Sequence, residues 1–486
     1  MLDNRLKICS DFVSGKGVAC DVGTDHAYLA ADLILSGKCK KVIASDINQG
    51  PLEAAEKTVE KYEISDNVEL ILSNGLENVP PDDVTDIIIA GMGGETIADI
   101  LEKCQWARYG VNLILQPMTK ISFLRKWLYD NGYEIKTEKL AKDGEKLYTV
   151  MQAAWTACLK KLSDADSVRG FFAEDDMLAD SYLNSEAEKL ERVSVSLKNA
   201  GRNYESMHNN SLSNIVRNGA KTFSVNEIYD YLDSLYPFSA QEKWDNSGLL
   251  IESTYMECKK VLLTLDIDYR NCFNAKRYGA ELIISHHPVI FEPLKKITAN
   301  SAVHYLVKND ISAICMHTNL DIASGGTNGV ILKKLADKYE FEGEAEPFED
   351  CGGGNTLGYI CNLKESVSAE DFGKTLKEIF GCEYVRMNRN CRKNVKRFAF
   401  CSGSGGSSLD IAIEKKCDAY ITGDVKHNFW IDANNDNFIL YDCGHFHTEN
   451  LVLEKLRYVL EKKFPQLEVI ISDCSVDPVM YIKSVL

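Results

Sequence analysis

Histidine and carboxylate side chains recur in the second half of the chain, at the ends of apolar runs that should form strands. His286 and His287 end the run ELIIS, and adjacent side chains there can point to different sides. His445 and Glu449 are four residues apart, so they would share one face of a helix. Imidazole and carboxylate groups bind divalent metals, and their recurrence predicts a metal site for Zn, Fe, Mn or Ni. The other candidates of this kind are His317, Asp321, Asp424 and His427.

Two metal ions suit adjacent histidines better than one. Two ions about 3.5–4 Å apart, with a bridging carboxylate, can activate a water molecule and hold an oxyanion. The second half is therefore predicted to carry a dinuclear, hydrolytic site. The glycine-rich run CSGSGGSS, residues 401–408, could cradle a phosphate through its amides or form a tight strand-to-helix turn, and the sequence favours neither.

A second group of candidate residues stands in the first half, again after apolar runs. Gly23, in DVGTDHAYL, lets the backbone approach a ligand, and the following helix offers free amides. Asp46 ends the next run, where a carboxylate can accept hydrogen bonds from both ribose hydroxyls of a nucleoside cofactor. Because a pyrophosphate-binding glycine series is lacking, the pattern favours S-adenosyl-L-methionine over NAD. Asn74 would meet the adenine edge, and the glycine turn at residues 91–94 would admit a substrate base.

These candidates need strands to position them, and the first 160 residues alternate short apolar runs with helical spacing. Such runs are typical of a parallel sheet buried on both faces, so we predict a Rossmann-like α/β domain over residues 1–160. Residues 161–202 carry apolar residues at helical spacing and predict an antiparallel helical hairpin. Residues 203–221 are rich in Asn, Ser and Gly and predict a linker, which leaves residues 222–486 as a second α/β domain. The strand-like runs are 17–23, 41–46, 68–73, 86–91 and 111–116.

The formal net charge of −17 disfavours a general nucleic-acid coat or a basic membrane-surface protein. Residues 101–150 are locally basic, with nine Lys and Arg against six acidic residues. Lys120, Arg125 and Lys126 should lie on one helix near the substrate edge of the sheet, either contacting phosphates or forming a solvated face. No run reaches the roughly 18 apolar residues of a membrane span, and the N-terminus lacks a signal-peptide pattern. We therefore expect a soluble, cytoplasmic protein with no membrane partner.

The motifs of the first half resemble those of a known family. DVGTDHAYL, ASDIN, NGLENV, AGMGGETIADIL and LILQPMTKISFLRKWLYDNGYEI stand in the order found in bacterial tRNA (adenine(22)-N(1))-methyltransferases. The resemblance covers about residues 1–220 and implies S-adenosyl-L-methionine as cofactor and tRNA as partner. Asn74 departs from the family pattern, which usually has Asp there. The residues that the resemblance places around the cofactor are Asp21, Gly23, Thr24, Asp25, Asp46, Ile47, Asn74, Gly75, Gly91, Met92 and Gly93.

Methylation of adenine N1 asks little of the protein beyond alignment. The in-plane lone pair of N1 must face the methyl group and sulfur with water excluded, after the base has left its stack. Asp25 is the candidate catalytic residue, steering the exocyclic amine or the proton balance of the base. The alternative is that Asp25 only caps the first helix. The helical hairpin would grip the RNA by shape.

The motifs of the second half resemble the dinuclear metal-centre proteins named GTP cyclohydrolase 1 type 2 homologues. WDNSGLLI, LTLDID, LIISHHPVIF, HTNLDIASGGTNG, FCSGSGGSSLD, AYITGDVKHN and DCGHFHTE follow that family's order over about residues 222–486. The resemblance implies a homohexameric ring, with Asp321 as the bridging and catalytic carboxylate. His447 is an addition to the pattern, either a further ligand or an outward histidine. The implied ligands are His286, His287, Asp321, His445 and Glu449; His317, Asp424 and His427 would stand behind them or contact substrate, and Asp245 and Asn246 would line the entrance.

The leading hypothesis is a fusion of a tRNA adenine-N1 methyltransferase with a dinuclear-metal hydrolase that acts on a small, nucleotide-like molecule. Two alternatives stay open. The second half could be a metal-binding scaffold or metal chaperone without turnover. The first half could methylate a small molecule or only bind the cofactor.

Overall fold

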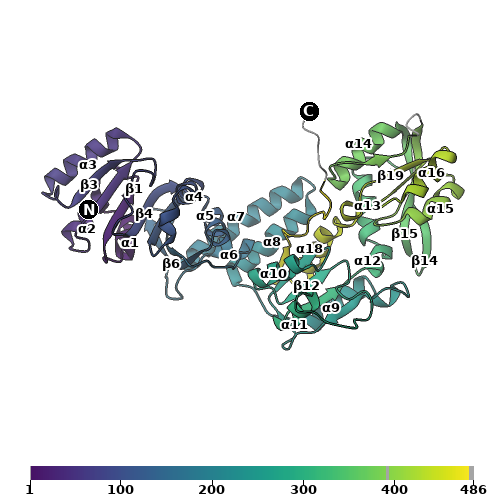
Figure 1. Cartoon of the computed structure of the whole chain (residues 1–486). Helices are drawn as coiled ribbons and strands as arrows, with labels where there is room; N and C mark the ends of the chain where they lie inside the picture. Colours follow the sequence, from purple (N-terminus) through teal and green to yellow (C-terminus); the bar gives the residue numbers. More distant parts are fainter. Residues whose placement is uncertain (1, 390–392, 481–486) are drawn as a thin grey trace. The chain divides into compact units, whose positions relative to one another are not determined.

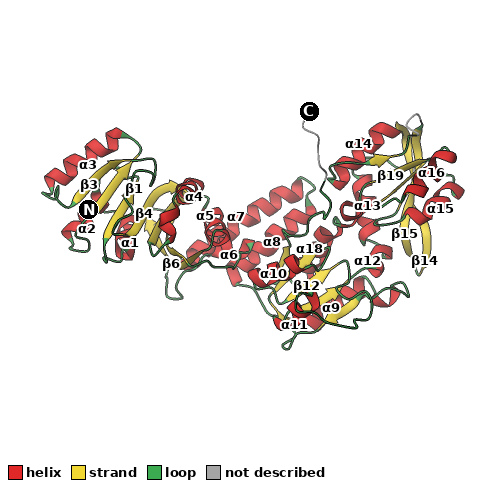
Figure 2. Ribbon diagram, viewed as in Figure 1, coloured by secondary structure: helices red, strands yellow, loops and turns green. Residues whose placement is uncertain are grey.

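The computed structural model describes residues 2–389 and 393–480. Figure 1 follows the elements along the chain, and Figure 2 separates helices from strands. The chain forms two compact units, Met1–Ser196 with Leu212–Gly219, and Leu197–Ser211 with Ala220–Leu486. Among the described residues, every helix is too short or too polar to span a membrane.

A seven-stranded sheet is the centre of the first unit. Its strands are β1 (Val18–Val22), β2 (Val42–Asp46), β3 (Val68–Leu72), β4 (Val84–Gly93), β5 (Asn112–Thr119), β6 (Tyr133–Asp143) and β7 (Lys146–Trp155). They are ordered β3-β2-β1-β4-β5-β7-β6, with the first five parallel and β7 antiparallel to both of its neighbours. The helices around them are α1 (Asn4–Phe12), α2 (Tyr28–Leu35), α3 (Gln49–Lys61), α4 (Gly94–Lys103), η1 (Gln105–Arg108), α5 (Ile121–Asp130) and α6 (Asp164–Arg169).

Strand β4 shows why near-continuous apolar runs form this sheet. Ile87 and Ile89 pack into one hydrophobic core, while Ile88, between them, packs into another. All three side chains are fully buried, because alternate residues of a strand face opposite sides of a sheet that is covered on both. The predicted Rossmann-like α/β fold is confirmed.

The predicted linker at residues 203–221 is wrong, because most of it is helical. α7 (Ala179–Asn199) is followed by α8 (Asn203–Asn218), and Arg217 Nη1 lies 2.6 Å from Glu191 Oε1. The hairpin therefore consists of α7 and α8 and extends beyond residue 202. Leu212, Ile215 and Val216 are buried at helical spacing. Burial of this face outweighs the weak helix propensity of the Asn and Ser residues.

Arg125 does not lie on an RNA-facing surface, contrary to the sequence prediction. Its guanidinium and the carboxylate of Glu138 are both 0% exposed and form a two-pronged ion pair, with distances of 2.6 and 2.9 Å. Arg125 Nη1 also donates to Ser167 O at 2.8 Å and to the Tyr182 hydroxyl at 3.3 Å. The side chain thus joins α5, β6 and the start of the hairpin, and cannot reach a phosphate.

Two further sheets form the second unit. The five-stranded sheet has the order β20-β11-β12-β13-β9, and the six-stranded sheet has the order β14-β15-β17-β18-β19-β16. A two-stranded ribbon joins β8 (Phe223–Ser224) and β10 (Glu257–Cys258). The larger strands are β9 (Gly248–Ile251), β11 (Lys260–Thr264), β12 (Leu282–Ser285), β13 (Ser312–Cys315), β14 (Glu346–Gly352), β15 (Asn355–Ser368), β16 (Arg386–Met387), β17 (Asn394–Phe400), β18 (Ala419–Thr422), β19 (Ile439–Asp442) and β20 (Glu468–Ile471).

Helices connect these strands. They are α9 (Val225–Leu235), η2 (Phe238–Ala240), α10 (Tyr269–Tyr278), α11 (Ala302–Lys308), α12 (Thr318–Ile322), α13 (Thr327–Ala336), α14 (Ala369–Phe380), η3 (Gly406–Ser408), α15 (Leu409–Glu414), α16 (His427–Asn435), α17 (His445–Glu449) and α18 (Val452–Lys463). The second unit is thus an α/β domain, as predicted.

Strand register brings the candidate metal residues together. In the five-stranded sheet, Thr264 pairs with Ser285 and Ser285 with Cys315, at the carboxyl ends of three parallel strands. In the six-stranded sheet, Thr422 pairs with Asp442 in the same way. The residues that follow these ends therefore emerge side by side at one edge of each sheet, where α/β proteins bind ligands.

Replacing Arg125 by Ala is expected to destabilise the first unit by about 3–5 kcal/mol, because Glu138 would stay buried without its partner. Urea unfolding followed by fluorescence measures this change. Lys126→Ala, which removes the solvent-exposed pair with Asp164, is the matched control and should cost only about 0–1 kcal/mol. Equal costs for the two variants would contradict the assignment of Arg125 as a buried anchor.

Candidate functional site

Glu449 lies at the centre of a buried imidazole cluster in the second unit. Its Oε2 is 3.0 Å from His445 Nε2 and 3.1 Å from His287 Nε2. The same oxygen is 3.6 Å from His286 Nε2, and the Glu449 side chain is only 4% exposed. His445 and Glu449 stand one turn apart on α17, so this short helix itself holds them side by side.

Asp321, on α12, lies on the other side of His286. Its Oδ1 is 3.6 Å from His286 Nε2 and 3.4 Å from Ser402 Oγ. Glu449 belongs to two groups of potential ligands and Asp321 to one, so the geometry gives the central position to Glu449, whereas the resemblance made Asp321 the bridge. The three groups, each with ligand atoms within 4.8 Å of one another, are His286–His287–His317, His287–His445–Glu449 and His286–Asp321–Glu449.

Each of the four clustered histidines is held through its Nδ1 atom. This leaves every Nε2 available to a metal ion, the arrangement in which an outer partner sets the orientation of a histidine ligand. The Nδ1 partners are Met316 O for His286 (2.8 Å), Asp266 for His287 (2.7 Å), Asp245 for His317 (2.8 Å) and Asp424 for His445 (3.0 Å).

Buried polar atoms without hydrogen bonds are a second reason to expect a cation in the cluster. Within the described residues, His286 Nε2 and Glu449 Oε2 are buried and make no well-aligned hydrogen bond, although imidazole nitrogens lie 3.0–3.6 Å from the carboxylate oxygen. Buried polar atoms are normally satisfied, and an unsatisfied pair at one point is accounted for by an ion that both would bind. The donor set of imidazole nitrogens and carboxylate oxygens suits Zn, Fe, Mn or Ni.

The electrostatics of the cluster agree with a cationic occupant. Burial lowers the pKa of His287, but the hydrogen bond with Asp266 and the nearby carboxylate of Glu449 outweigh it and raise the pKa to about 10. The pKa of His445 is raised to about 9, since Glu449 outweighs the effect of burial. Burial also opposes ionisation of Glu449, yet His286 and the neighbouring imidazoles hold its pKa well below the usual range. Surroundings that favour positive charge among the imidazoles would also favour a divalent ion there.

Sequence reasoning missed Asp266 as part of this site. It follows β11 just as His286 and His287 follow β12, and the register of these strands places its carboxylate beside His287. The signal was available in LTLDID, where acidic residues follow an apolar run. A carboxylate after one strand was less conspicuous than two adjacent histidines.

Two histidines of the motifs stand apart from the cluster. His427 is exposed at the start of α16 and belongs to none of the three ligand groups. His447 lies 3.1 Å from Asp477 through Nε2, so the structure gives it a carboxylate partner of its own. Asp245, which the resemblance places at the entrance, has a fully buried side chain; it accepts hydrogen bonds from His317 and Thr318, and these outweigh burial and hold its pKa well below the usual range.

The glycine-rich run at residues 401–408 is a tight turn against the cluster. A Cβ atom on Gly403 would lie 2.1 Å from Glu449 Oε1, and the φ of Gly403 is +64°. The amides of Gly403 and Gly405 donate to the hydroxyls of Thr448 and Thr422. The turn therefore shapes the space around Glu449, and these two amides are already used in hydrogen bonds.

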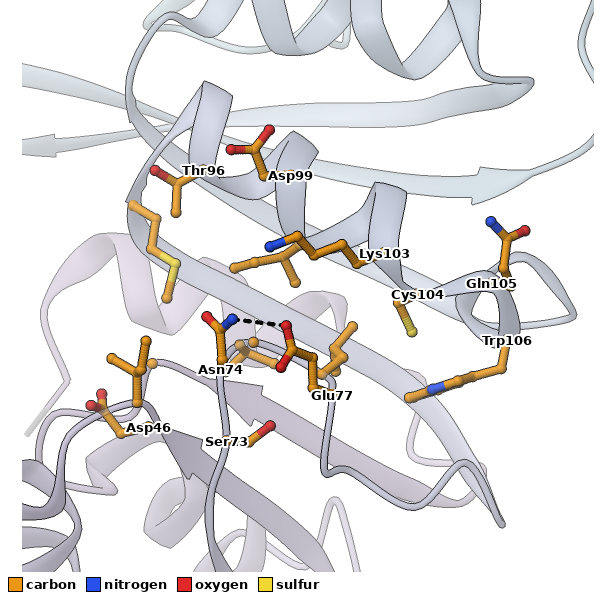
Figure 3. A pocket seen from close by; sticks show the side chains of 17 residues that line it. Asp46, Ser73, Asn74, Glu77, Thr96, Asp99, Lys103, Cys104, Gln105 and Trp106 are labelled. Atoms are coloured by element: carbon orange, nitrogen blue, oxygen red, sulfur yellow. Dashed lines mark hydrogen bonds between the residues drawn. The ribbon is translucent and has the colours of Figure 1, made fainter.

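A cavity of about 590 Å³ opens at the carboxyl ends of β1, β2 and β3 in the first unit, the size of a small-molecule site (Figure 3). Six of the predicted cofactor residues line it: Gly23, Asp46, Ile47, Asn74, Gly75 and Met92. Five others do not belong to its lining: Asp21, Thr24, Asp25, Gly91 and Gly93.

The remaining predicted residues of this half have different surroundings. Asp21 is buried, and desolvation raises its pKa to about 6 against the effect of a hydrogen bond from Thr24. Asp25 is 82% exposed, 3.5 Å from His26. Lys120 is 61% exposed beside Glu95, and Lys126 pairs with Asp164. Of the three residues predicted to contact phosphates, only Arg125 is too buried to do so.

The far wall of the cavity was not predicted from the sequence. Figure 3 shows Thr96, Asp99 and Lys103 across the cavity from Asn74 and Glu77. Asn74 Nδ2 donates to Glu77 Oε1 at 2.8 Å. The side-chain oxygen of Asn74 takes no part in this bond and could accept one from a ligand. The helical spacing of α4 after AGMGG could have indicated which of its residues face the cavity.

Glu449→Gln is expected to bind much less metal than the wild-type chain, which is predicted to hold about two ions per chain, because a neutral amide leaves the imidazoles without their shared carboxylate. Elemental analysis of purified protein measures the content. Glu454→Gln, the same change on α18, should keep the full content. Retention of metal by Glu449→Gln would contradict the central position of Glu449.

Comparisons with known proteins also match the two halves of the chain to different families. A family model described as Duf34/NIF3 (NGG1p interacting factor 3) matches residues 223–478, and a methyltransferase domain model matches residues 2–151.

A GTP cyclohydrolase 1 type 2 homolog of Campylobacter jejuni is 33% identical over 261 residues, which are 53% of this chain and 99% of that protein. A tRNA (adenine(22)-N(1))-methyltransferase of Bacillus subtilis is 35% identical over 153 residues, 31% of this chain and 64% of that protein. The crystal structure of a Staphylococcus aureus hypothetical protein matches 53% of this chain and 99% of its own, with 26% identity and a TM-score of 0.50. The chain belongs to the Duf34/NIF3 family and carries a methyltransferase domain ahead of the residues that place it there.

Proposed function

We propose that the first half transfers a methyl group from S-adenosyl-L-methionine to N1 of an adenine in tRNA. The observation that carries the proposal is the cavity at the strand ends, with Asp46 and Asn74 on its wall. The similarity to the Bacillus subtilis enzyme supports tRNA as the substrate. The cofactor supplies an electrophilic methyl group on a sulfonium.

The residues of the first half would act mainly by orientation. The Asp46 carboxylate would accept hydrogen bonds from the ribose hydroxyls, and Asn74 would bind the adenine edge through the oxygen that Glu77 leaves free. The turn around Gly91 and Gly93 would admit the substrate base beside Met92, which lines the cavity. Asp25, exposed on the turn after β1, would accept a hydrogen bond from the exocyclic amine of the incoming base. Lys120 and Lys126 would contact phosphates.

The second half is proposed to be a dinuclear-metal hydrolase acting on a small, nucleotide-like molecule. His286, His287, His445, Asp321 and Glu449 would hold two divalent ions, which supply Lewis acidity and an activated water. His317 and Asp424 would orient these groups and the substrate. The observation that carries the proposal is the shared, unsatisfied carboxylate oxygen of Glu449 among three imidazoles. The proposed assembly is a homohexameric ring, which the mass of the particle in solution tests.

Asp46→Ala is expected to lower methyl transfer to unmodified tRNA by at least about tenfold, since the ribose would lose its carboxylate anchor. Labelled methyl donor measures transfer, and mapping of the product nucleoside identifies N1 of adenine. Asp66→Ala, an exposed carboxylate in the loop before β3, should match the wild type. If both wild type and Asp46→Ala leave tRNA unlabelled, tRNA methylation is excluded.

Asp321→Asn is expected to lower hydrolysis by the metal-loaded chain by about 100-fold or more, because a neutral amide would replace the buried carboxylate next to His286 that is proposed to help hold the ions. A panel of phosphoesters, nucleotides and cyclic amides provides the assay. His304→Ala, on α11 outside the cluster, should retain the rate. Metal-loaded wild type that turns over none of the panel would favour a metal-binding scaffold instead.

A further inference from the structure

Two large aromatic side chains stand exposed beside the metal-binding cluster of the second unit. Trp244 is 59% exposed and Phe291 is 49% exposed. Single exposed apolar residues are ordinary on protein surfaces, but contiguous ones next to a polar site mark places where ligands bind. Their ring centroids lie 5.9 Å apart and their planes are tilted by 46°, so the two rings are adjacent and form a bent aromatic surface.

This surface ends on a residue of the cluster. The imidazole of His317 lies 6.0 Å from Trp244 and 6.2 Å from Phe291, edge to face with both. The same ring is 5.3 Å from His286 and 5.5 Å from His287. A flat molecule stacked on one of these two rings and touching the other would therefore present its edge or a substituent to the cluster.

Hydrogen bonds hold the aromatic surface in place. Asp245, next to Trp244 in the chain, accepts from His317 Nδ1 at 2.8 Å and from Thr318 N at 3.0 Å. Asn246 Nδ2 donates to Ile290 O at 2.6 Å, which ties the Trp244 segment to the Phe291 segment. Both aromatic residues are thus anchored through their sequence neighbours, and a preorganised surface loses little entropy when a ligand binds.

We propose that Trp244 and Phe291 form a stacking platform for a planar heteroaromatic ring of the substrate, held next to the metal centre. The inference rests on the proposed hydrolytic function and narrows its substrate to molecules with such a ring, for which nucleobases are the model. Aromatic side chains accept any flat ring by stacking, and offset or edge-to-face contacts add to the area that is buried. A phosphate or sugar alone would gain nothing from this surface.

Calorimetric titration of the metal-loaded full chain with guanosine 5′-monophosphate tests the platform, with ribose 5-phosphate as the ring-free probe. Trp244→Ala and Phe291→Ala should each weaken binding of the nucleotide by about 5- to 150-fold, given stacking of about 1–3 kcal/mol per base. Trp244→Phe should retain most of the affinity, and binding of ribose 5-phosphate should not change. Tyr255→Ala, which removes another exposed aromatic residue of the unit, is the matched control.

Three outcomes would overturn the platform. The nucleotide and ribose 5-phosphate could bind the wild type equally, or neither could bind. The Trp244 and Phe291 variants, with metal content intact, could bind the nucleotide as the wild type does. The variants could instead lower the mass of the particle in solution, which would make the surface an interface between copies. Failure of the hydrolytic function is distinguishable, because metal-loaded protein would then bind the ring in a Trp244-dependent way without turnover.

Discussion

The second unit is organised around one oxygen atom, Glu449 Oε2, which is buried within 3.6 Å of three imidazole nitrogens. A carboxylate without compensation in such a place would cost several kcal/mol, so its neighbours have to supply positive charge. The neighbouring imidazoles favour the ionised form of Glu449, and divalent cations bound at the same place would favour it as well. The burial of this one group therefore constrains the positions of everything near it.

Those neighbours come from distant parts of the sequence. His287 and His445 are 158 residues apart in the chain, yet their Nε2 atoms lie 3.3 Å from each other. They meet because each follows the carboxyl end of a parallel strand, β12 in one sheet and β19 in the other. The turn at Gly403 leaves room for Glu449 only because it has no side chain. The imidazole–carboxylate cluster, the strand register and the glycine turn are thus parts of one arrangement.

Two sequence predictions were wrong because burial is decided by tertiary packing and not by local composition. Arg125 stands in a locally basic segment and resembles a phosphate contact, but its partner Glu138 lies 13 residues away on a neighbouring strand. Nothing in the local sequence separates a buried ion pair from a solvated face. Likewise, the composition of residues 203–221 predicted a linker. Most of this segment is the helix α8, and its packing involves residues remote in sequence, which composition does not reveal. Local propensity is a weak guide where tertiary burial decides.

The sequence by itself determined the division into two α/β halves and the residue types of both sites, because strand ends and ligand types leave local patterns. Apolar runs followed by His, Asp or Gly are readable without a structure. Only the tertiary structure decided that Glu449 is central, that Asp266 supports His287, that Asn74 pairs with Glu77, and that Trp244 and Phe291 flank the cluster. These relations depend on distances between segments remote in the chain, and such distances are set by sheet register and packing.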